Sequence, residues 1–320
     1  MARCHAVSED TQEAAPGGET DAVILRAFLA NLGIAIAKFV AAAITGSSAM
    51  LTEGVHSLVD TLNEMLLWYG RKRSRRPADA LHPLGYGREL YFWTVIVGVM
   101  IFGVGAGVSF YEGVEHIRHP VQTTQPLVAF GVLGVALLLE SWSLVKAVEE
   151  FQRTRKSQSL RKAIHDIKDI PTLAVLLEDS AAVAGILIAA VGIGLELWFD
   201  APVFDGIASI LIGVLLAGVA VVLLRESKHL LIGESADPDL TAAIGNLVAS
   251  EAGVARLCEV IALQLSPDTV IAVISLDFDD AMTANEVETR SAELEARIVD
   301  RLNEVERAFV RAAGGATPRS

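Results

Sequence analysis

The chain has 320 residues, of which 52% are hydrophobic, and a formal net charge of −13. Its mean hydropathy of +0.46 is too high for an ordinary soluble protein of this length. Two cysteines, Cys4 and Cys258, support neither a disulfide framework nor a thiolate metal cluster. No Walker loop, dinucleotide fingerprint or nucleophile–base arrangement is recognisable in the sequence, so we do not expect an enzyme.

The chain begins with a polar stretch, residues 1–20, that lacks the charged and then apolar layout of a signal peptide. We expect a disordered tail there. Residues 21–232 contain six apolar stretches long enough to predict membrane-spanning helices, and hence an all-α, six-helix transmembrane bundle. These stretches run approximately over Ala22–Thr45, Ala49–Tyr69, Leu90–Gly113, Leu127–Val148, Thr172–Leu197 and Phe204–Leu224.

Basic residues are concentrated in two of the connections between these spans. Arg71, Lys72, Arg73, Arg75 and Arg76 follow the second span, and Arg153, Arg155, Lys156, Arg161, Lys162 and Lys168 follow the fourth. Because lysine and arginine are enriched in cytoplasmic loops, both connections are expected in the cytoplasm. Six spans then place both termini in the cytoplasm, and we expect a multi-pass protein of the bacterial inner (plasma) membrane.

Hydropathy falls after Gly233, and residues 233–320 show the pattern of a small cytoplasmic domain. Asp237 is expected to cap the first of its helices. The whole pattern predicts the order αββαβ, an α+β, ferredoxin-like arrangement. Its elements are expected at Pro238–Ser250, Leu257–Leu265, Val270–Phe278, Glu286–Leu302 and Val305–Arg311. The domain has 16 Asp and Glu against 7 Arg and no Lys, a net charge of −9 that disfavours nucleic acid as a partner.

His56 and Asp60 lie four residues apart inside the second apolar stretch. This spacing places both side chains on one face of a helix, with their Cβ atoms about 5–6 Å apart. An ionisable group in hydrocarbon costs roughly 2.5–3.5 kcal/mol, so such residues usually serve an ion or substrate path. An imidazole and a carboxylate are also suitable ligands for a transition-metal dication. The alternative is a His56 that merely forms a hydrogen bond within a helix bundle.

Other ionisable and polar residues also fall within the predicted spans. Lys38 and Glu53 are expected to neutralise each other, because intramembrane charges usually pair. Glu140 has two possible roles: it lines a proton or metal path, or it forms a hydrogen bond with Ser143 or a neighbouring helix. Asn31 is expected to join two helices by hydrogen bonding.

Three sequence runs carry a family resemblance. The second span reads GSSAMLTEGVHSLVDTLNEMLL and is followed by RSRRPADALHPLGYGRELYFW, while the sixth contains FDGIASILIGVLL. Together with the α+β tail, these runs resemble the cation diffusion facilitator family of divalent metal/proton antiporters. The HPLGYGRELYFW segment is most similar to the branch that includes the mitochondrial zinc transporter of animals.

The resemblance implies a transported metal bound between the second and fifth spans, with two ligands from each helix. His56 and Asp60 match the first pair. In the fifth span, the run EDSAAVAG aligns Asp179 with the family's aspartate through the glycine at Gly185. The position one turn earlier, usually His or Asp in the family, is Val175, which cannot bind a metal.

Three candidates remain for the fourth coordination position. Glu178 is adjacent to Asp179 but lies about 100° around the helix. It either reaches the metal or pairs with a cation on another helix. Asn63 lies seven residues after His56 on the same helical face and offers an amide oxygen. A water molecule is the third candidate.

The family's additional metal sites are incomplete in this sequence. In the loop after the second span, Asp79 and His82 match the family pattern, but Tyr86 replaces its second histidine. We therefore expect a weak site or none, with His82 fixing the turn instead. The tail domain has no histidine, and Cys258 and Ser275 occupy positions where relatives often place ligands. We expect no structural metal there and a homodimer that forms through packing alone.

The expected function is zinc efflux from the cytoplasm by proton antiport, with no fixed cofactor and with Zn²⁺ and H⁺ as the transported ions. Metal ligands must be deprotonated, so metal binding expels protons and protons on the far side displace the metal. Mixed nitrogen and oxygen ligands suit zinc but also admit manganese or iron(II). A transporter of another small cation and a non-transporting metal-sensing or scaffold homologue are the remaining alternatives.

Overall fold

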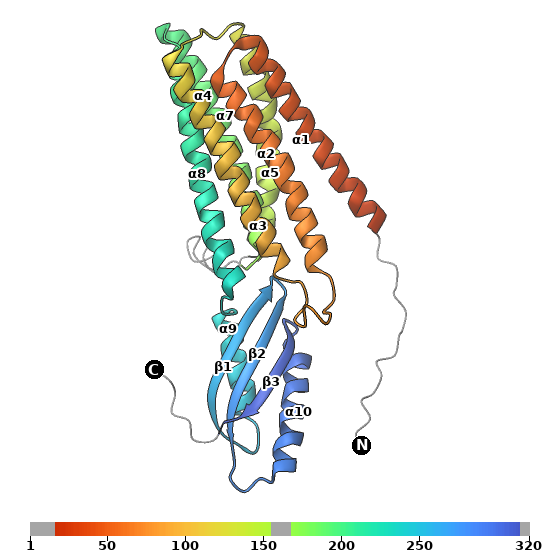
Figure 1. Cartoon of the computed structure of the whole chain (residues 1–320). Coiled ribbons are helices and arrows are strands. Elements are labelled where there is room, and N and C mark those ends of the chain that lie inside the picture. The colour runs from red at the N-terminus through yellow and green to blue at the C-terminus, as the bar shows by residue number, and fades with distance from the viewer. Residues whose placement is uncertain (1–16, 155–167, 314–320) are drawn as a thin grey trace.

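The computed structural model describes residues 17–154 and 168–313, which form a long helical part with a small sheet part at one end (Figure 1). We call the end of the helical part that faces the sheet the sheet side. The helical elements are α1 (Gly17–Thr45), α2 (Ser48–Ser74), α3 (Glu89–Met100), a π-helical segment η1 (Ile101–Ala106), α4 (Gly107–Arg118), α5 (Pro126–Thr154), α7 (Ile170–Phe199) and α8 (Val203–Ile232).

Four helical stretches are long and apolar enough to cross a membrane: Glu89–Arg118, Pro126–Glu149, Ile170–Phe199 and Val203–Ile232. The first is continuous through α3, η1 and α4. Of the described part of α1, only Asn31–Thr45 forms an apolar helix, and it is shorter than a span. Helix α2 fails the same criterion because it combines intramembrane acids with a basic end. Both helices nevertheless pack against each other beside the apolar four.

Two expectations fall on residues outside this description. The disordered tail was expected at residues 1–20, of which 1–16, including Cys4, lie outside the described residues, whereas α1 already begins at Gly17. The same holds for most side chains of the basic run after the fourth span, namely Arg153, Arg155, Lys156, Arg161 and Lys162.

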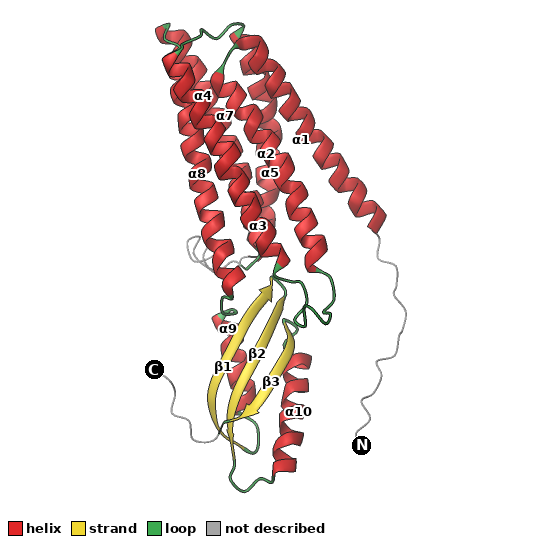
Figure 2. Cartoon of the chain, viewed as in Figure 1, coloured by secondary structure: helices red, strands yellow, loops and turns green. Residues whose placement is uncertain are grey.

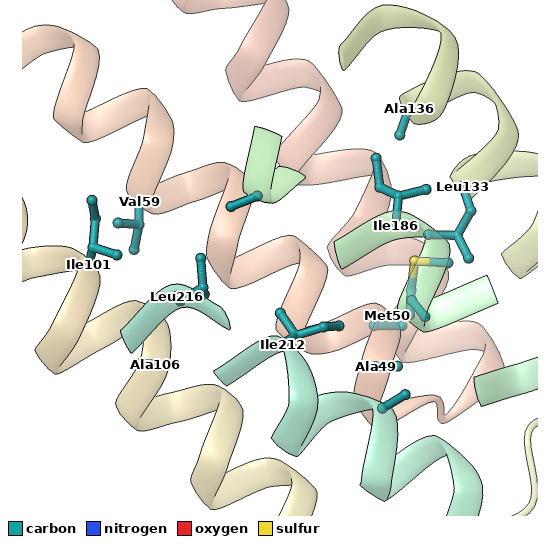
Figure 3. Close-up of a cluster of buried hydrophobic side chains, with 14 of the residues drawn as sticks. Ala49, Met50, Val59, Ile101, Ala106, Leu133, Ala136, Ile186, Ile212 and Leu216 are labelled. Carbon is teal, nitrogen blue, oxygen red and sulfur yellow. The ribbon is translucent and has the colours of Figure 1, made fainter. Parts of the chain in front are cut away.

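Small residues bring the helices of the bundle close together. A Cβ atom on Gly113 of α4 would overlap the backbone oxygen of Gly206 in α8, so these two helices cross in backbone contact. A buried apolar cluster fills the space where α2, η1, α5, α7 and α8 meet (Figure 3). The labelled members are Ala49, Met50, Val59, Ile101, Ala106, Leu133, Ala136, Ile186, Ile212 and Leu216.

Both ends of α2 are held by side chains. At its first turn, farthest from the sheet, buried Asp205 of α8 accepts hydrogen bonds from the backbone nitrogens of Ser48 at 2.5 Å and Ala49 at 3.2 Å. A carboxylate at this position also interacts favourably with the helix dipole. At the other end, Arg73 of α2 donates to both carboxylate oxygens of Glu89 in α3, with distances of 2.8–3.1 Å.

The sheet part contains α9 (Pro238–Ala249), β1 (Val254–Ser266), β2 (Thr269–Phe278), α10 (Ala284–Arg301) and β3 (Val305–Ala312) (Figure 2). This is the expected order of helices and strands, with boundaries shifted by at most three residues. The strands lie in the order β1-β2-β3, with β2 antiparallel to β1 and parallel to β3. Both helices share one apolar core with the sheet. The predicted cap is confirmed, since the Asp237 side chain accepts from the backbone nitrogen of Asp239.

The sheet part contacts the sheet side of the helical part directly. Lys168, which precedes α7, pairs with Glu234, which follows α8, at 2.8 Å. Gly87, in the loop between α2 and α3, packs against the carbonyl of Leu265 in β1 so closely that a Cβ would not fit. The basic residues at the end of α2 and Lys168 therefore lie on the same side of the bundle as the sheet.

Candidate metal site

His56 and Asp60 form a buried pair on α2. Nδ1 of His56 lies 3.3 Å from Oδ1 of Asp60, and the two side chains are 2% and 18% exposed. Nε2 of His56 is buried and has no hydrogen-bond partner among the described residues. Oδ1 of Asp60 likewise has no hydrogen-bond partner among the described residues, so the pair is a close contact that leaves Nε2 and this oxygen available for a metal. For both residues to bind one ion directly, the imidazole would have to turn.

Asp179 lies on α7, close enough to interact electrostatically with His56 and Asp60. It is half-buried, and its Oδ2 accepts a hydrogen bond of 2.8 Å from the Ser143 hydroxyl of α5. Asp179 is thus near the α2 pair, but in this conformation it is bonded to the neighbouring helix.

Glu178 and Asn63, two candidates for the fourth position, are bonded to each other. Nδ2 of Asn63 on α2 donates to Oε1 of Glu178 on α7 at 3.0 Å, and the residues are 0% and 5% exposed. Oδ1 of Asn63 is buried without a partner in the described part of the chain. In this conformation the bonded partner of Glu178 is therefore a neutral amide on another helix, and not the cation that was one of its two alternatives.

Val175 faces away from the helix interface. It is 36% exposed, whereas Ala174 and Glu178 are buried. In this conformation Glu178 bonds α7 to α2 through Asn63. The position where the family places a further ligand is exposed rather than buried among the helices.

Glu64 is a residue of this region that the sequence analysis did not single out. It follows Asp60 by four residues and so extends the face of α2 that carries the pair. It is half-buried and accepts a hydrogen bond of 2.7 Å from Asn31 of α1, which confirms that Asn31 joins two helices. His56, Asp60 and Glu64 follow one another at intervals of four residues, and this spacing could have indicated Glu64 from the sequence.

Glu140 of α5 is the second acid near the pair. It interacts electrostatically with Asp60 and Asp179. Ser143, proposed above as one possible partner for Glu140, donates its hydroxyl hydrogen bond to Asp179 instead. Glu140 therefore lies near the His56–Asp60 pair, and the hydrogen bond with Ser143 suggested above is not formed.

No group of three or more His, Cys, Asp or Glu side chains within residues 17–154 and 168–313 is arranged closely enough to hold a metal ion. In the structure His56 contacts Asp60, and Asn63 contacts Glu178. These two pairs and Asp179 do not converge on a single metal position. A metal bound by both helices thus requires the carboxylate of Asp179 or Glu178 to come closer to the His56–Asp60 pair, and each has one oxygen outside the hydrogen bond described above.

The expected neutralisation of Lys38 by Glu53 is confirmed. Nζ of Lys38 on α1 lies 3.0 Å from Oε2 of Glu53 on α2, and both side chains are fully buried. The ammonium also donates to the Ser57 hydroxyl at 2.7 Å. The other oxygen of Glu53 lies against Gly185 of α7, which leaves no room for a Cβ there. This ion pair therefore connects three helices beside His56.

In the loop between α2 and α3, Asp79 is bonded within its own turn. Its Oδ1 accepts from the backbone nitrogens of Leu81 and His82, and its Oδ2 accepts from the Tyr86 hydroxyl at 2.6 Å. The hydrogen bond from Tyr86 is the main cause that lowers the pKa of Asp79. The expected role of His82 in the turn is confirmed, since its ring also lies over Tyr86 with centroids 4.2 Å apart.

The two residues singled out in the sheet part have partners near the last strand. Cys258 of β1 is half-buried, and its sulfur lies 3.8 Å from the carbonyl oxygen of Ala313. Ser275 of β2 accepts a hydrogen bond of 2.7 Å from Arg311 of β3. Both side chains thus connect neighbouring parts of the sheet.

Comparison with known proteins identifies a family. A family model described as the cation efflux transmembrane domain matches residues 24–232. The chain is 35% identical to the human mitochondrial proton-coupled zinc antiporter SLC30A9, over 76% of this chain and 43% of that protein. It is 36% identical to metal tolerance protein C4 of Arabidopsis thaliana, over 60% and 43% of the two chains.

A bacterial protein is also similar. A cadmium, cobalt and zinc/H(+)-K(+) antiporter of Bacillus velezensis is 24% identical over 73% of this chain and 71% of that protein. The chain spans less than half the length of the human and plant relatives that it matches.

Proposed function

Because the chain belongs to the cation efflux family, also called the cation diffusion facilitator family, we propose that it carries a divalent metal cation across a membrane. Members of this family are transporters rather than enzymes. The observation that carries the proposal is the buried His56–Asp60 pair, whose unbonded Nε2 lies in a helical part that contains four apolar spans.

Zinc is the proposed metal, moved out of the cytoplasm in exchange for protons. The names of the human and bacterial relatives specify zinc and protons, and those quoted above specify neither manganese nor iron. An imidazole nitrogen together with carboxylate oxygens is a typical zinc ligand set. Manganese or iron(II) transport is the alternative that a direct comparison of metals would decide.

In the proposed mechanism, the metal binds between α2 and α7. His56 offers Nε2, while Asp60 fixes the orientation of the imidazole or, after the ring turns, binds as well. Asp179 leaves the Ser143 hydroxyl to complete the contact from α7, and Glu178, Asn63 or water fills the remaining position. Because these ligands bind metal only when deprotonated, binding releases protons, and protons arriving from the far side displace the metal.

We also propose a topology and a domain division. Helices α1 and α2 cross the membrane together with the four apolar spans, which gives six crossings over residues 21–232. Residues 233–320 then form a ferredoxin-like cytoplasmic domain, with both termini on its side, and two copies dimerise by packing. The positive-inside rule supports this orientation, because Arg71–Arg76 and Lys168 lie on the sheet side. The bacterial inner membrane is the proposed location.

The test is metal uptake into proteoliposomes under a pH gradient, with zinc, manganese, iron and cadmium compared. Wild type should move zinc and dissipate the gradient, whereas Asp60→Ala and Asp179→Ala should do neither. Glu115→Ala, which removes an exposed acid at the end of α4, is the matched control and should transport normally. Normal transport by both site variants would overturn the site, and no transport of any metal by wild type would favour a scaffold.

A further inference from the structure

The segment Arg71–Arg76, at the end of α2 and just beyond it, carries an unusual density of positive charge. Four of its five basic side chains are exposed on the sheet side of the bundle. We call Arg71, Lys72, Arg75 and Arg76 the basic end of α2. The fifth, Arg73, is different, because its guanidinium is half-buried and bonded to Glu89 through both carboxylate oxygens.

Within residues 17–154 and 168–313, no carboxylate pairs directly with the basic end. None of the four residues lies within 4.0 Å of a carboxylate oxygen of any described residue. Asp79, the acid that follows them in the chain, accepts hydrogen bonds within its own turn through both oxygens. Glu234, where the sheet part meets the helices, is paired with Lys168. The acidic sheet part thus leaves these four charges available to an outside anion.

Aromatic side chains surround the helix one turn before the basic end. Tyr69 of α2 and Trp93 of α3 meet edge to face with ring centroids 4.9 Å apart, and Phe92 packs beside Trp93 at 5.5 Å. Tyr69 is 40% and Phe92 46% exposed. Nζ of Lys72 lies 5.1 Å from the centre of the Trp68 ring. Exposed tyrosine and tryptophan at the end of a membrane helix mark the depth of the lipid headgroups.

We propose that the basic end of α2 binds the phosphate groups of anionic phospholipids in the sheet-side leaflet. Arginine donors match phosphate oxygens in geometry as well as charge, and basic residues next to a membrane helix attract anionic lipids. A lipid is the favoured occupant because the charges follow directly on the aromatic girdle. The chain's net charge of −13, by contrast, repels a soluble polyanion that approaches from the solvent. This inference does not depend on which ion the protein carries.

The test measures which lipids the full-length protein retains in mixed micelles of phosphatidylcholine and phosphatidylglycerol in equal amounts. Wild type should be enriched in phosphatidylglycerol, and salt should weaken this preference because it screens exposed charges. Changing Arg75→Gln and Arg76→Gln together should reduce the enrichment about fivefold for each charge removed. Arg75→Lys with Arg76→Lys keeps the charge and should retain most of it.

A second pair of variants controls for total charge. Arg225→Gln with Lys228→Gln removes two exposed charges from the sheet side of α8, away from the basic end. These changes should reduce the phosphatidylglycerol enrichment less than Arg75→Gln with Arg76→Gln does. An equal reduction would overturn the proposal that the basic end of α2 binds the lipid. The proposal also fails if wild type retains both lipids equally, or if inorganic phosphate alone saturates the site and abolishes any lipid preference. Size-exclusion chromatography verifies that each variant is folded. If the double variant Arg75→Gln with Arg76→Gln is not folded, the single variant Arg75→Gln replaces it.

Discussion

Asn63 of α2 donates a hydrogen bond of 3.0 Å to Glu178 of α7, and both side chains are buried. The bond lies one helical turn from Asp60 towards the sheet. It joins the two helices that are proposed to share the metal, and it holds an acid that would otherwise face apolar surroundings. This contact and the metal therefore compete for the same carboxylate.

Asn63→Ala should destabilise the bundle, because it leaves the buried Glu178 carboxylate without its donor. The expected loss is about 1–3 kcal/mol in the free energy of unfolding. Thermal unfolding in detergent measures it, and adding Glu178→Gln to the same chain should restore part of the loss. An Asn63→Ala protein as stable as wild type would contradict the structural role of this bond.

Lys38→Met should destabilise the bundle more strongly, since it strands the fully buried Glu53 carboxylate. Removing one partner of a buried ion pair typically costs about 3–5 kcal/mol. The double variant Lys38→Met with Glu53→Gln should lose much less, because no unpaired charge remains. The measurement is the free energy of unfolding of wild type, Lys38→Met, Glu53→Gln and the double variant. If the losses of the two single variants add up to that of the double variant, the two residues do not interact.

Gly185→Ala should separate α2 from α7, because the added methyl group would overlap the Glu53 carboxylate. Overpacking of this kind costs about 1–3 kcal/mol. Gly194→Ala on the same helix is the matched control, since a Cβ there meets nothing within 4 Å. The control should be neutral or slightly stabilising, and equal effects of the two substitutions would contradict the packing described here.

Val175→His tests the orientation of α7. Because Val175 is 36% exposed rather than buried between the helices, the new imidazole should leave the zinc affinity unchanged if this conformation is the one that binds metal. Zinc titration of the detergent-purified protein measures this, with Val191→His, another exposed position of α7, as the control. Tighter binding in Val175→His alone would mean that α7 binds the metal in a different orientation.

The capping box of α10 should make the sheet part sensitive to acid. The hydrogen bonds that Thr283 donates from its backbone nitrogen and hydroxyl lower the pKa of Glu286 from its usual value of 4.5. The stabilisation is therefore fully present above pH 4.5 and is lost as the pH falls through the lower, folded-state pKa. Hydrogen exchange of residues 284–301 should be faster in Glu286→Gln than in wild type at neutral pH, with the difference vanishing in acid.

Several contacts were predictable from the sequence because only one arrangement satisfied the chemistry. Lys38 and Glu53 are opposite charges within apolar stretches and were expected to pair, and Asp237 precedes a proline that can begin a helix. The strands were equally clear, since their alternating residues lie between turn residues. In each case a local pattern and a strong physical preference agreed.

The rotation of α7 was not predictable in the same way. Its sequence is apolar on nearly every side, so hydrophobic periodicity does not indicate which face is buried. Glu178 and Asp179 are adjacent acids, and small alanines follow them, so neither choice meets a steric obstacle. The bond between Ser143 and Asp179 escaped prediction for a related reason, because a partner on another helix is invisible in the sequence.

The hydrogen bonds that hold both ends of α2, to Asp205 and to Glu89, would limit how access to the proposed metal site alternates. A helix fixed at its two termini cannot slide along its length or tilt without breaking the hydrogen bonds at those ends. The smaller displacement is a spin of α7 about its own axis. Since successive residues of an α-helix are separated by about 100°, a spin of that size would bring Asp179 to the position that Glu178 now occupies beside Asn63.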